Sequence, residues 1–193
     1  MVEALTSLAT SAGLGIGAGI NAYATFLAFG LLSRNFPDLF KGDLATFFSS
    51  TPALILFGIL YTIEFLADKI PAVDHVWDII HTFVRPVAGA LVALAAAHPG
   101  VPRGVVITSA ILGGGMALGS HLTKASLRAA STATTAGIAN PILSIGEDIF
   151  AFAGSAMAIF VPFLFLALLL LVIIPVVYLV RLAFRRRSRA AVS

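Results

Sequence analysis

Acidic and basic side chains recur at helical spacing between residues 64 and 85, in a chain that carries few charges elsewhere. If the segment after Pro71 is a helix, four of them form one stripe at i, i+4, i+7 and i+11, namely Asp74, Asp78, His81 and Arg85. Glu64 and Asp68 lie on one face of the segment before it. Such carboxylates could bind a cation or pass on a proton, and the histidine can change charge near neutral pH.

A second group of charges follows between residues 121 and 148. His121, Lys124 and Arg128 are spaced at i, i+3 and i+7, which places them on one helix face. Farther along, Glu147 and Asp148 are adjacent in an apolar segment. The two groups are separated by two predicted membrane crossings, so they are expected to lie on the same face of the membrane.

The acidic pair requires partners. Asn140 and Pro141 indicate a helix start, so Glu147 and Asp148 lie about two turns inside the helix, too deep for the helix dipole to explain them. Positive side chains that could balance them are Arg85, Lys124 and Arg128.

Two interpretations of these charges remain open. In the first, they are ion pairs and solvated faces that fix helix packing. In the second, charged groups that enter a bilayer face an internal cavity and mark an ion pathway or a binding site. We take the second as the leading hypothesis, with Glu64, Asp68, Asp74 and Asp78 forming an acidic vestibule.

No cofactor motif is evident, although the oxygen-rich set leaves room for a divalent cation such as Mg²⁺ or Ca²⁺. The ligands of such an ion would come from Asp74, Asp78 and Glu147, whose spacing matches no dedicated metal motif. The chain has no cysteine, which excludes thiol chemistry.

Catalysis is not expected. Arg85-Pro86 and Ser120-His121 share residue types with membrane lipid phosphatases, but their order and spacing do not fit. A lipid-modifying enzyme is kept as the third option, after a transporter and a non-transporting scaffold or lipid-binding protein.

Composition indicates an integral membrane protein. Of the 193 residues, 59% are hydrophobic and 11% are charged. Soluble domains are about 45–50% apolar and about 25% charged. The mean hydropathy is +1.02. We therefore expect an all-α, polytopic protein with a single transmembrane domain.

The apolar runs predict five or six transmembrane helices, with short amphipathic or re-entrant helices between them. The first two are expected over about residues 8–32 and 52–67, and the charged helix should continue past Pro86 to a turn at residues 98–100. Residues 141–184 have about twice the length of one span, so they should form either two short spans that turn near residues 154–162 or a re-entrant half-helix plus one span.

The basic tail, residues 181–193, sets the expected orientation. Its arginines follow an apolar helix directly, which the positive-inside rule assigns to the cytoplasm, and we expect an inner-membrane protein. The N-terminus lacks the basic residues of a cleaved signal peptide. No nucleic-acid recognition module accompanies the arginines. The expected partners are membrane lipid, other copies of the chain, and a small ion or polar solute.

Glycines recur at an offset of one hundred residues. Small residues allow helices to approach closely, so the positions in and near these motifs are expected to pack helices or line a cavity. They are Gly15, Gly19, Asn21, Tyr23, Gly115, Gly119, His121 and Asn140. The offset could reflect two three-helix repeats over residues 1–100 and 101–180, or chance recurrence of packing glycines.

Several of these residues together resemble a known family. They are Asn21-Ala22-Tyr23 after a glycine-rich helix, Glu64 followed by DKIPAVD and Asp78, Arg85-Pro86, Lys124 with Arg128, and Ser144 with Glu147-Asp148. The pattern resembles the bacterial membrane proteins grouped as domain of unknown function 4126, over about residues 11–155. The resemblance implies a small polytopic membrane protein and transfers no substrate, cofactor or catalytic residue.

The leading hypothesis is a small transporter or channel-like protein that moves an ion or small polar solute past intramembrane acids.

Overall fold

The computed structural model describes the backbone of residues 1–190 and the side chains within it, apart from those of residues 71–76, 78, 179–180 and 183–190. Residues 1–190 form helices joined by short connections, which confirms the all-helical class. The helices are α1 (Val2–Ile20), α2 (Ala22–Asn35), α3 (Asp43–Ser49), α4 (Thr51–Ala67), α5 (Pro71–Ala95), α6 (Arg103–Thr135), α7 (Asn140–Phe160) and α8 (Pro162–Ala190).

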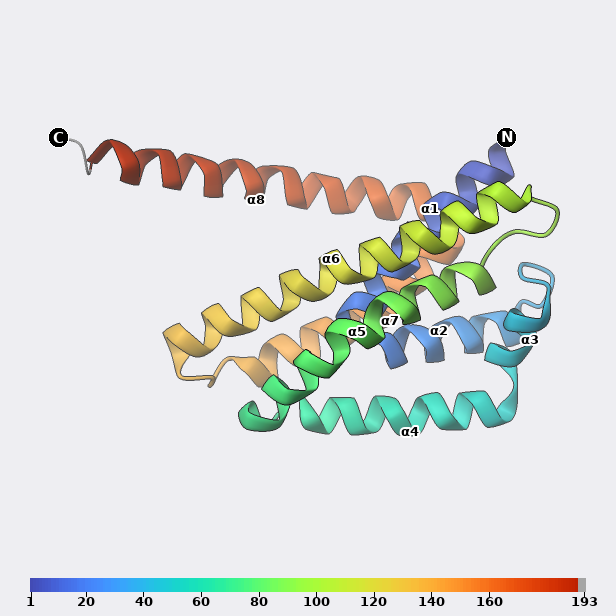
Figure 1. Cartoon of the computed structure of the whole chain (residues 1–193), viewed down its shortest axis with the longest axis horizontal. Coiled ribbons are helices and arrows are strands. Elements are labelled where there is room, and N and C mark those ends of the chain that lie inside the picture. Colours follow the sequence, from blue (N-terminus) through green and yellow to red (C-terminus); the bar gives the residue numbers. More distant parts are fainter. Residues whose placement is uncertain (191–193) are drawn as a thin grey trace.

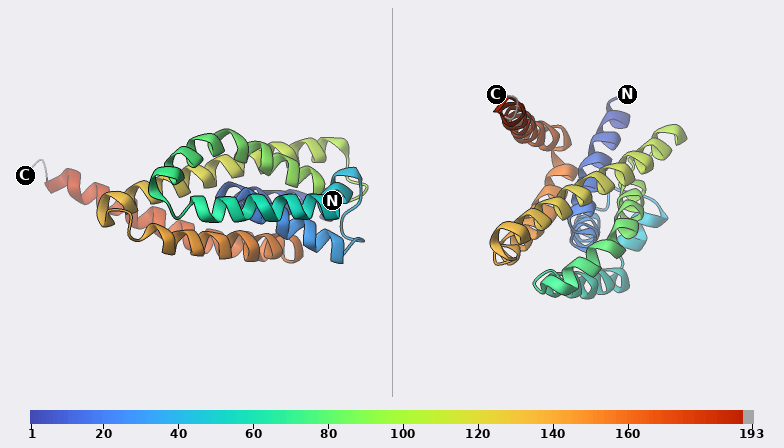
Figure 2. Two further views of the ribbon diagram at one scale, coloured as in Figure 1. Left: turned by 90° about the horizontal axis from the view of Figure 1, so that it is seen from below. Right: turned by 60° about the vertical axis from the view of Figure 1, so that its left-hand side comes forward.

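Helix α1 lies at the centre of the bundle. It makes its most extensive contacts with α6, α5 and α7, while α4 lies along α2 on the outer side (Figure 1). The long helix α6 also runs beside α5. Helix α8 contacts α1 and α7 near its start and then diverges from the other helices (Figures 1 and 2).

Large apolar side chains cover much of the outer surface. Examples are Ile55 on α4, Ile111 on α6, Ile149 on α7 and Leu171 on α8, each more than half exposed. A surface of this kind suits contact with lipid.

The number of spans differs from the prediction. Among the described residues, only α6 and α7 are long and apolar enough to cross a membrane, and a third span results if the bent pair α3 and α4 counts as one. The predicted five or six spans therefore exceed what length and composition support. The excess arises because apolar runs were counted without the bends and breaks that shorten them, such as the 62° bend between α3 and α4.

Another break lies at Asn21, inside the predicted first span. Asn21 has an extended backbone conformation (φ −147°, ψ 107°), and its side-chain Oδ1 accepts a hydrogen bond from the Ala24 N–H at 2.9 Å. It therefore caps the N-terminus of α2, a role that asparagine favours. The segment predicted as the first span therefore forms parts of two helices, α1 and α2.

Other predicted boundaries are confirmed. Helix α5 begins at Pro71 and continues through Pro86, and α7 begins at Asn140 with Pro141 in its first turn. The chain turns between Phe160 and Pro162, within the predicted region. Proline explains all three starts, because it needs no hydrogen-bond acceptor in the first turn of a helix.

The glycines of α1 and α6 play different parts. A Cβ at Gly19 would collide with Ser120 Oγ and the Ala117 carbonyl oxygen of α6, whereas Gly115 and Gly119 have open space around them. Gly19 is therefore needed for close packing of α1 on α6. The proposed repeat remains a prediction, and two residues that it pairs have different settings, since Asn21 lies at a helix break and His121 lies within α6.

This difference supplies a matched pair of substitutions. We expect Gly19→Ala to destabilise the protein by about 1–3 kcal/mol, because backbone and side chain of α6 must shift to admit the methyl group. Gly115→Ala should leave stability unchanged or raise it, since alanine favours helices and meets nothing there. Thermal unfolding in detergent measures both. Equal melting temperatures for the two variants would contradict the assigned packing role of Gly19.

Candidate functional site

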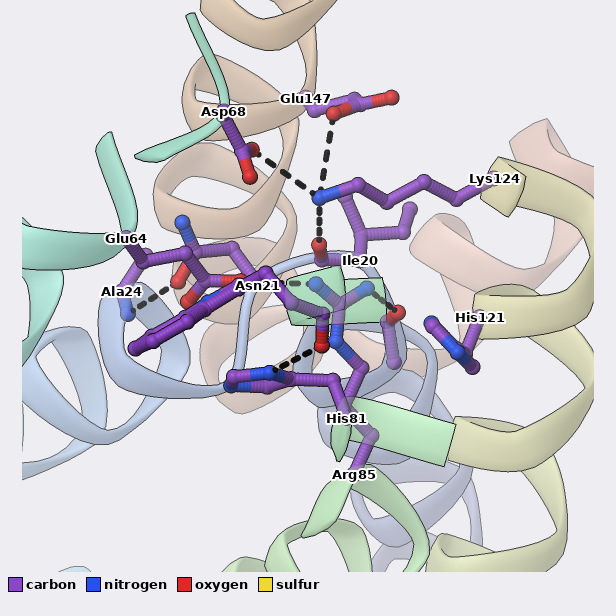
Figure 3. A network of polar contacts seen from close by, with 12 residues as sticks. Ile20, Asn21, Ala24, Glu64, Asp68, His81, Arg85, His121, Lys124 and Glu147 are labelled. Atoms are coloured by element: carbon purple, nitrogen blue, oxygen red, sulfur yellow. Dashed lines mark hydrogen bonds and ion pairs between the residues drawn. The ribbon is translucent and has the colours of Figure 1, made fainter. Parts of the chain in front are cut away.

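The centre of the bundle holds a buried network of charged side chains around the point where α1 ends. Lys124 of α6 lies in its middle (Figure 3). Its Nζ donates to the Ile20 carbonyl oxygen at 2.9 Å and lies 3.3 Å from both Asp68 Oδ2 and Glu147 Oε2. One ammonium group thereby joins α1, α6, α7 and the C-terminal end of α4.

Arg128, one helical turn after Lys124, contacts the same two acids. Its Nη2 lies 2.7 Å from Asp68 Oδ2 and also donates to Glu147 Oε2, while its Nε donates to Glu147 Oε1 at 3.2 Å. The guanidinium thus binds both carboxylate oxygens of Glu147, as its planar fork allows. Among the described side chains, two positive groups and two negative groups are thus joined in one cluster.

These cations determine the ionisation of Asp68, which directly follows the last residue of α4. Burial opposes its ionisation, but Lys124 and Arg128 outweigh burial and lower the pKa of the Asp68 carboxyl below its usual value. Asp68 is therefore ionised at neutral pH.

Arg85 of α5 forms the second part of the network. Its Nη2 donates to Glu64 Oε1 at 2.7 Å and its Nη1 donates to the Gly19 carbonyl oxygen at 2.6 Å, and both side chains are fully buried. A buried charge needs such pairing, because an isolated one would cost many kilocalories per mole. The pair joins α4 and α5 to the end of α1.

The network also completes the C-terminus of α1. The last carbonyl groups of a helix have no partner within it and carry a partial negative charge. Here Arg85 donates to the Gly19 carbonyl and Lys124 to the Ile20 carbonyl, while the Asn21 N–H donates to the Gly17 carbonyl at 2.9 Å. Side chains of α5 and α6 thereby stabilise the end of α1 inside the bundle.

Asn21 connects this helix end to the acid next to Glu147. Because its Oδ1 is used to cap α2, its Nδ2 faces Asp148 and donates to Oδ1 of that carboxyl at 2.9 Å. Asn21 is fully buried and Asp148 is 6% exposed. The other oxygen, Asp148 Oδ2, is buried with no hydrogen-bond partner among the described residues.

Two pockets approach the network. A groove of about 520 Å³ between α6 and α8, here called the α6–α8 groove, has mainly apolar walls and reaches Lys124 and Glu147. A second pocket of about 380 Å³, the Asp148 pocket, lies between α4 and α7 and is lined by Asp148, Tyr61 and apolar side chains. Consecutive helix residues point about 100° apart, so Glu147 and Asp148 face different pockets.

Two buried histidines, His81 and His121, lie beside the network. His81 Nδ1 lies 2.9 Å from the Trp77 carbonyl oxygen, and the His81 ring packs edge-on against Tyr23 with 5.7 Å between centroids. His121 Nε2 lies 3.0 Å from Thr82 Oγ1. The predicted site residue Asn140 is also buried, and its Nδ2 donates to Thr132 at 3.0 Å.

The structure thus brings together most of the predicted acids and cations, with two corrections. Arg85 pairs with Glu64 rather than with Glu147 or Asp148. Glu64 and Asp68 do not line an open vestibule, because both are buried in ion pairs. Their partners lie within hydrogen-bond distance, which spacing along one helix could not reveal.

Two predicted residues cannot be placed. The side chains of Asp74 and Asp78 lie outside the described residues. Asp74 and Asp78 are also two of the three suggested metal ligands. The third, Glu147, is ion-paired with Lys124 and Arg128. Among the side chains that are described, no group of three or more histidines and acids is placed to hold a metal ion.

Sequence reasoning missed the groups that belong to the helix break. The carbonyls of Gly19 and Ile20 act as acceptors only because α1 ends there. Asn21 was named as a packing residue, yet asparagine ahead of a helical segment is a recognised start signal that could have revealed the break. Of the residues predicted to pack helices or line a cavity, Gly115 and Gly119 face open space in the α6–α8 groove.

Comparison with known proteins gives one match. A family model described as domain of unknown function (DUF4126) matches residues 8–182, nearly the whole chain. No curated protein and no solved structure matches it.

Proposed function

The chain belongs to the family described as domain of unknown function 4126, and on that premise we propose that it is a small membrane transporter or channel-like protein for an ion or small polar solute. The description assigns no activity, so the proposal rests on the site. We place the protein in a bacterial inner membrane with its basic tail in the cytoplasm, as the positive-inside rule favours.

The observation that carries the proposal is the meeting of two pockets at the acidic pair of α7. The α6–α8 groove reaches Glu147 and the Asp148 pocket reaches Asp148. These two acids are adjacent on α7, so the two pockets reach the buried network at neighbouring residues. A path for a small charged species would connect the two pockets through a rearrangement of the ion pairs.

The broken helix supports the same interpretation. Helix ends and non-helical backbone at the centre of a transporter commonly contact the transported ion, since their carbonyl and N–H groups carry partial charges. The α1 end at Ile20 and the α2 start at Ala22 are both adjacent to the charged cluster. In the described structure, the ammonium of Lys124 occupies the place of a cation at the α1 end.

Glu147 provides the test. We expect Glu147→Gln to reduce flux by more than about tenfold, because it removes a charge that an ion would meet between the two pockets. Full-length protein in liposomes is measured for current under imposed gradients of H⁺, Na⁺, Cl⁻ and inorganic phosphate. Glu3→Gln is the matched control, since Glu3 is an exposed acid far from the network.

Two outcomes would contradict the proposal. One is equal flux in wild type, Glu147→Gln and an empty liposome for all four ions. The other is unchanged transport in Glu147→Gln alongside a lower melting temperature, which would assign the network a packing role.

That packing role is the second candidate function, a scaffold or lipid-binding protein without transport. It is favoured by the apolar α6–α8 groove, which suits an acyl chain, and by the ion pairs that join α4, α5, α6 and α7. A lipid-modifying enzyme is less well supported, since Ser120 and Arg85 are already bonded to carbonyls of α1.

A further inference from the structure

Among the described side chains of the network, one carboxyl group has no cation as its partner. Among the described side chains, Glu64 is paired with Arg85, and Asp68 and Glu147 share Lys124 and Arg128. These contacts use all three cations. The remaining acid in this described set, Asp148, has no described cation within ion-pair distance.

Asp148 is instead held by a neutral donor. Asn21 Nδ2 donates to Oδ1, and this orientation of the amide is fixed because Asn21 Oδ1 accepts from the Ala24 N–H. Oδ2 is buried and without a described partner, in a residue that lines the Asp148 pocket. A carboxylate in this setting would leave one oxygen unsatisfied at a substantial cost.

A proton fits this site better than a metal cation does. Sodium and divalent ions require several oxygen ligands, whereas the Asp148 pocket offers one carboxyl, the Tyr61 hydroxyl and otherwise apolar side chains. The Asn21 amide presents its N–H to the acid and so repels a cation. A proton needs a single lone pair, and Oδ2 supplies it.

We propose that Asp148 is the proton-binding residue of the network, loaded from the side of the Asp148 pocket. The step forms one O–H bond at Oδ2 and converts the carboxylate into a neutral carboxylic acid; release reverses it. The inference rests on the proposed function and deepens it by naming the proton as the transported or coupling ion.

Several charged and titratable groups act on this carboxyl. Glu64 of α4 and Asp68 after it disfavour a negative charge on Asp148, whereas the Asn21 amide and Lys124 of α6 favour it. Tyr61 also faces this carboxyl, as a neutral phenol. Loading of Asp148 thus depends on the state of the ion pairs. A movement that separates Lys124 from Asp68 and Glu147 would let Lys124 approach Asp148 and expel the proton.

The test uses the full chain in detergent and in liposomes. Dicyclohexylcarbodiimide is an apolar reagent that reacts with protonated carboxyl groups, and peptide mass spectrometry locates the product. We expect labelling of Asp148 that is lost as pH rises, is unaffected by Na⁺, and is absent from Glu147, the adjacent acid that is ion-paired. Infrared spectroscopy should show a protonated-carboxyl band that Asp148→Asn removes and Asp148→Glu retains.

Absence of that infrared band at every pH would overturn the inference, as would Na⁺-dependent protection or equal labelling of Glu147. Flux measurements separate the two proposals. A titrating Asp148 in a protein that moves no ion would leave Asp148 as a proton-binding residue but remove the transport function and the proton's role in it. Proton-independent flux that Asp148→Asn does not change would leave the transport function standing and overturn the inference about Asp148.

Discussion

The Arg85→Met variant is expected to lose about 3–5 kcal/mol of stability, because it leaves Glu64 as an unpaired charge in a fully buried position. The same substitution removes the donor to the Gly19 carbonyl at the end of α1. Two polar groups in the centre of the bundle would then lack partners. The loss should appear as a large drop in melting temperature in detergent and in the yield of folded protein.

The chain offers both a control and a rescue. Arg34→Met changes an exposed arginine that bonds Thr51 at 3.1 Å, and it should cost at most about 1 kcal/mol. Replacing Glu64 by leucine in the Arg85→Met background should recover a substantial part of the lost stability, since no unpaired charge remains. If the double variant is no more stable than Arg85→Met, the cost comes from packing of the arginine itself and not from Glu64.

The Arg128→Met variant should show its effect most clearly in acid. Asp68 and Glu147 would then share Lys124 alone, and loss of one partner from such a buried cluster costs about 3–5 kcal/mol. In the wild type, the pKa of Asp68 is lower in the folded protein than in the unfolded chain. The stability that this difference contributes is present above the unfolded pKa of about 4 and is lost as the pH falls through the lower folded pKa. Removing Arg128 raises the pKa of Asp68 in the folded protein, so unfolding in acid should begin at a higher pH.

Circular dichroism during acid titration in detergent measures this shift. Arg103→Met is the matched control, because Arg103 begins the same helix and is exposed. An acid midpoint that is the same in Arg128→Met and Arg103→Met would contradict the assignment of Arg128 to the stabilisation of ionised Asp68.

Much of the helical pattern could be predicted because proline and asparagine mark helix starts locally. Pro71, Pro141 and the turn before Pro162 were placed correctly for this reason. The break at Asn21 was missed because the apolar residues continue on both sides of it. An apolar run shows that a segment is buried or faces lipid, but it does not show that the backbone is continuous.

The members of the site could likewise be predicted, but their pairing could not. Charged residues in an apolar chain must meet, which identified Lys124, Arg128 and Glu147 as a group. Arg85 pairs with Glu64 because of the way α4 lies against α5 and α1. The spacing of residues along the sequence does not reveal that arrangement. The role of Asn21 depends on one hydrogen bond to Ala24 that fixes which end of its amide faces Asp148.

The ion pairs also tie assembly of the protein to the order of its synthesis. The two acids at the end of α4 are made first, yet Arg85 follows Glu64 by 21 residues and Arg128 follows Asp68 by 60. A chain still being made therefore carries uncompensated acids until α6 has joined it. The full set of buried ion pairs can therefore form only after α6 has been synthesised.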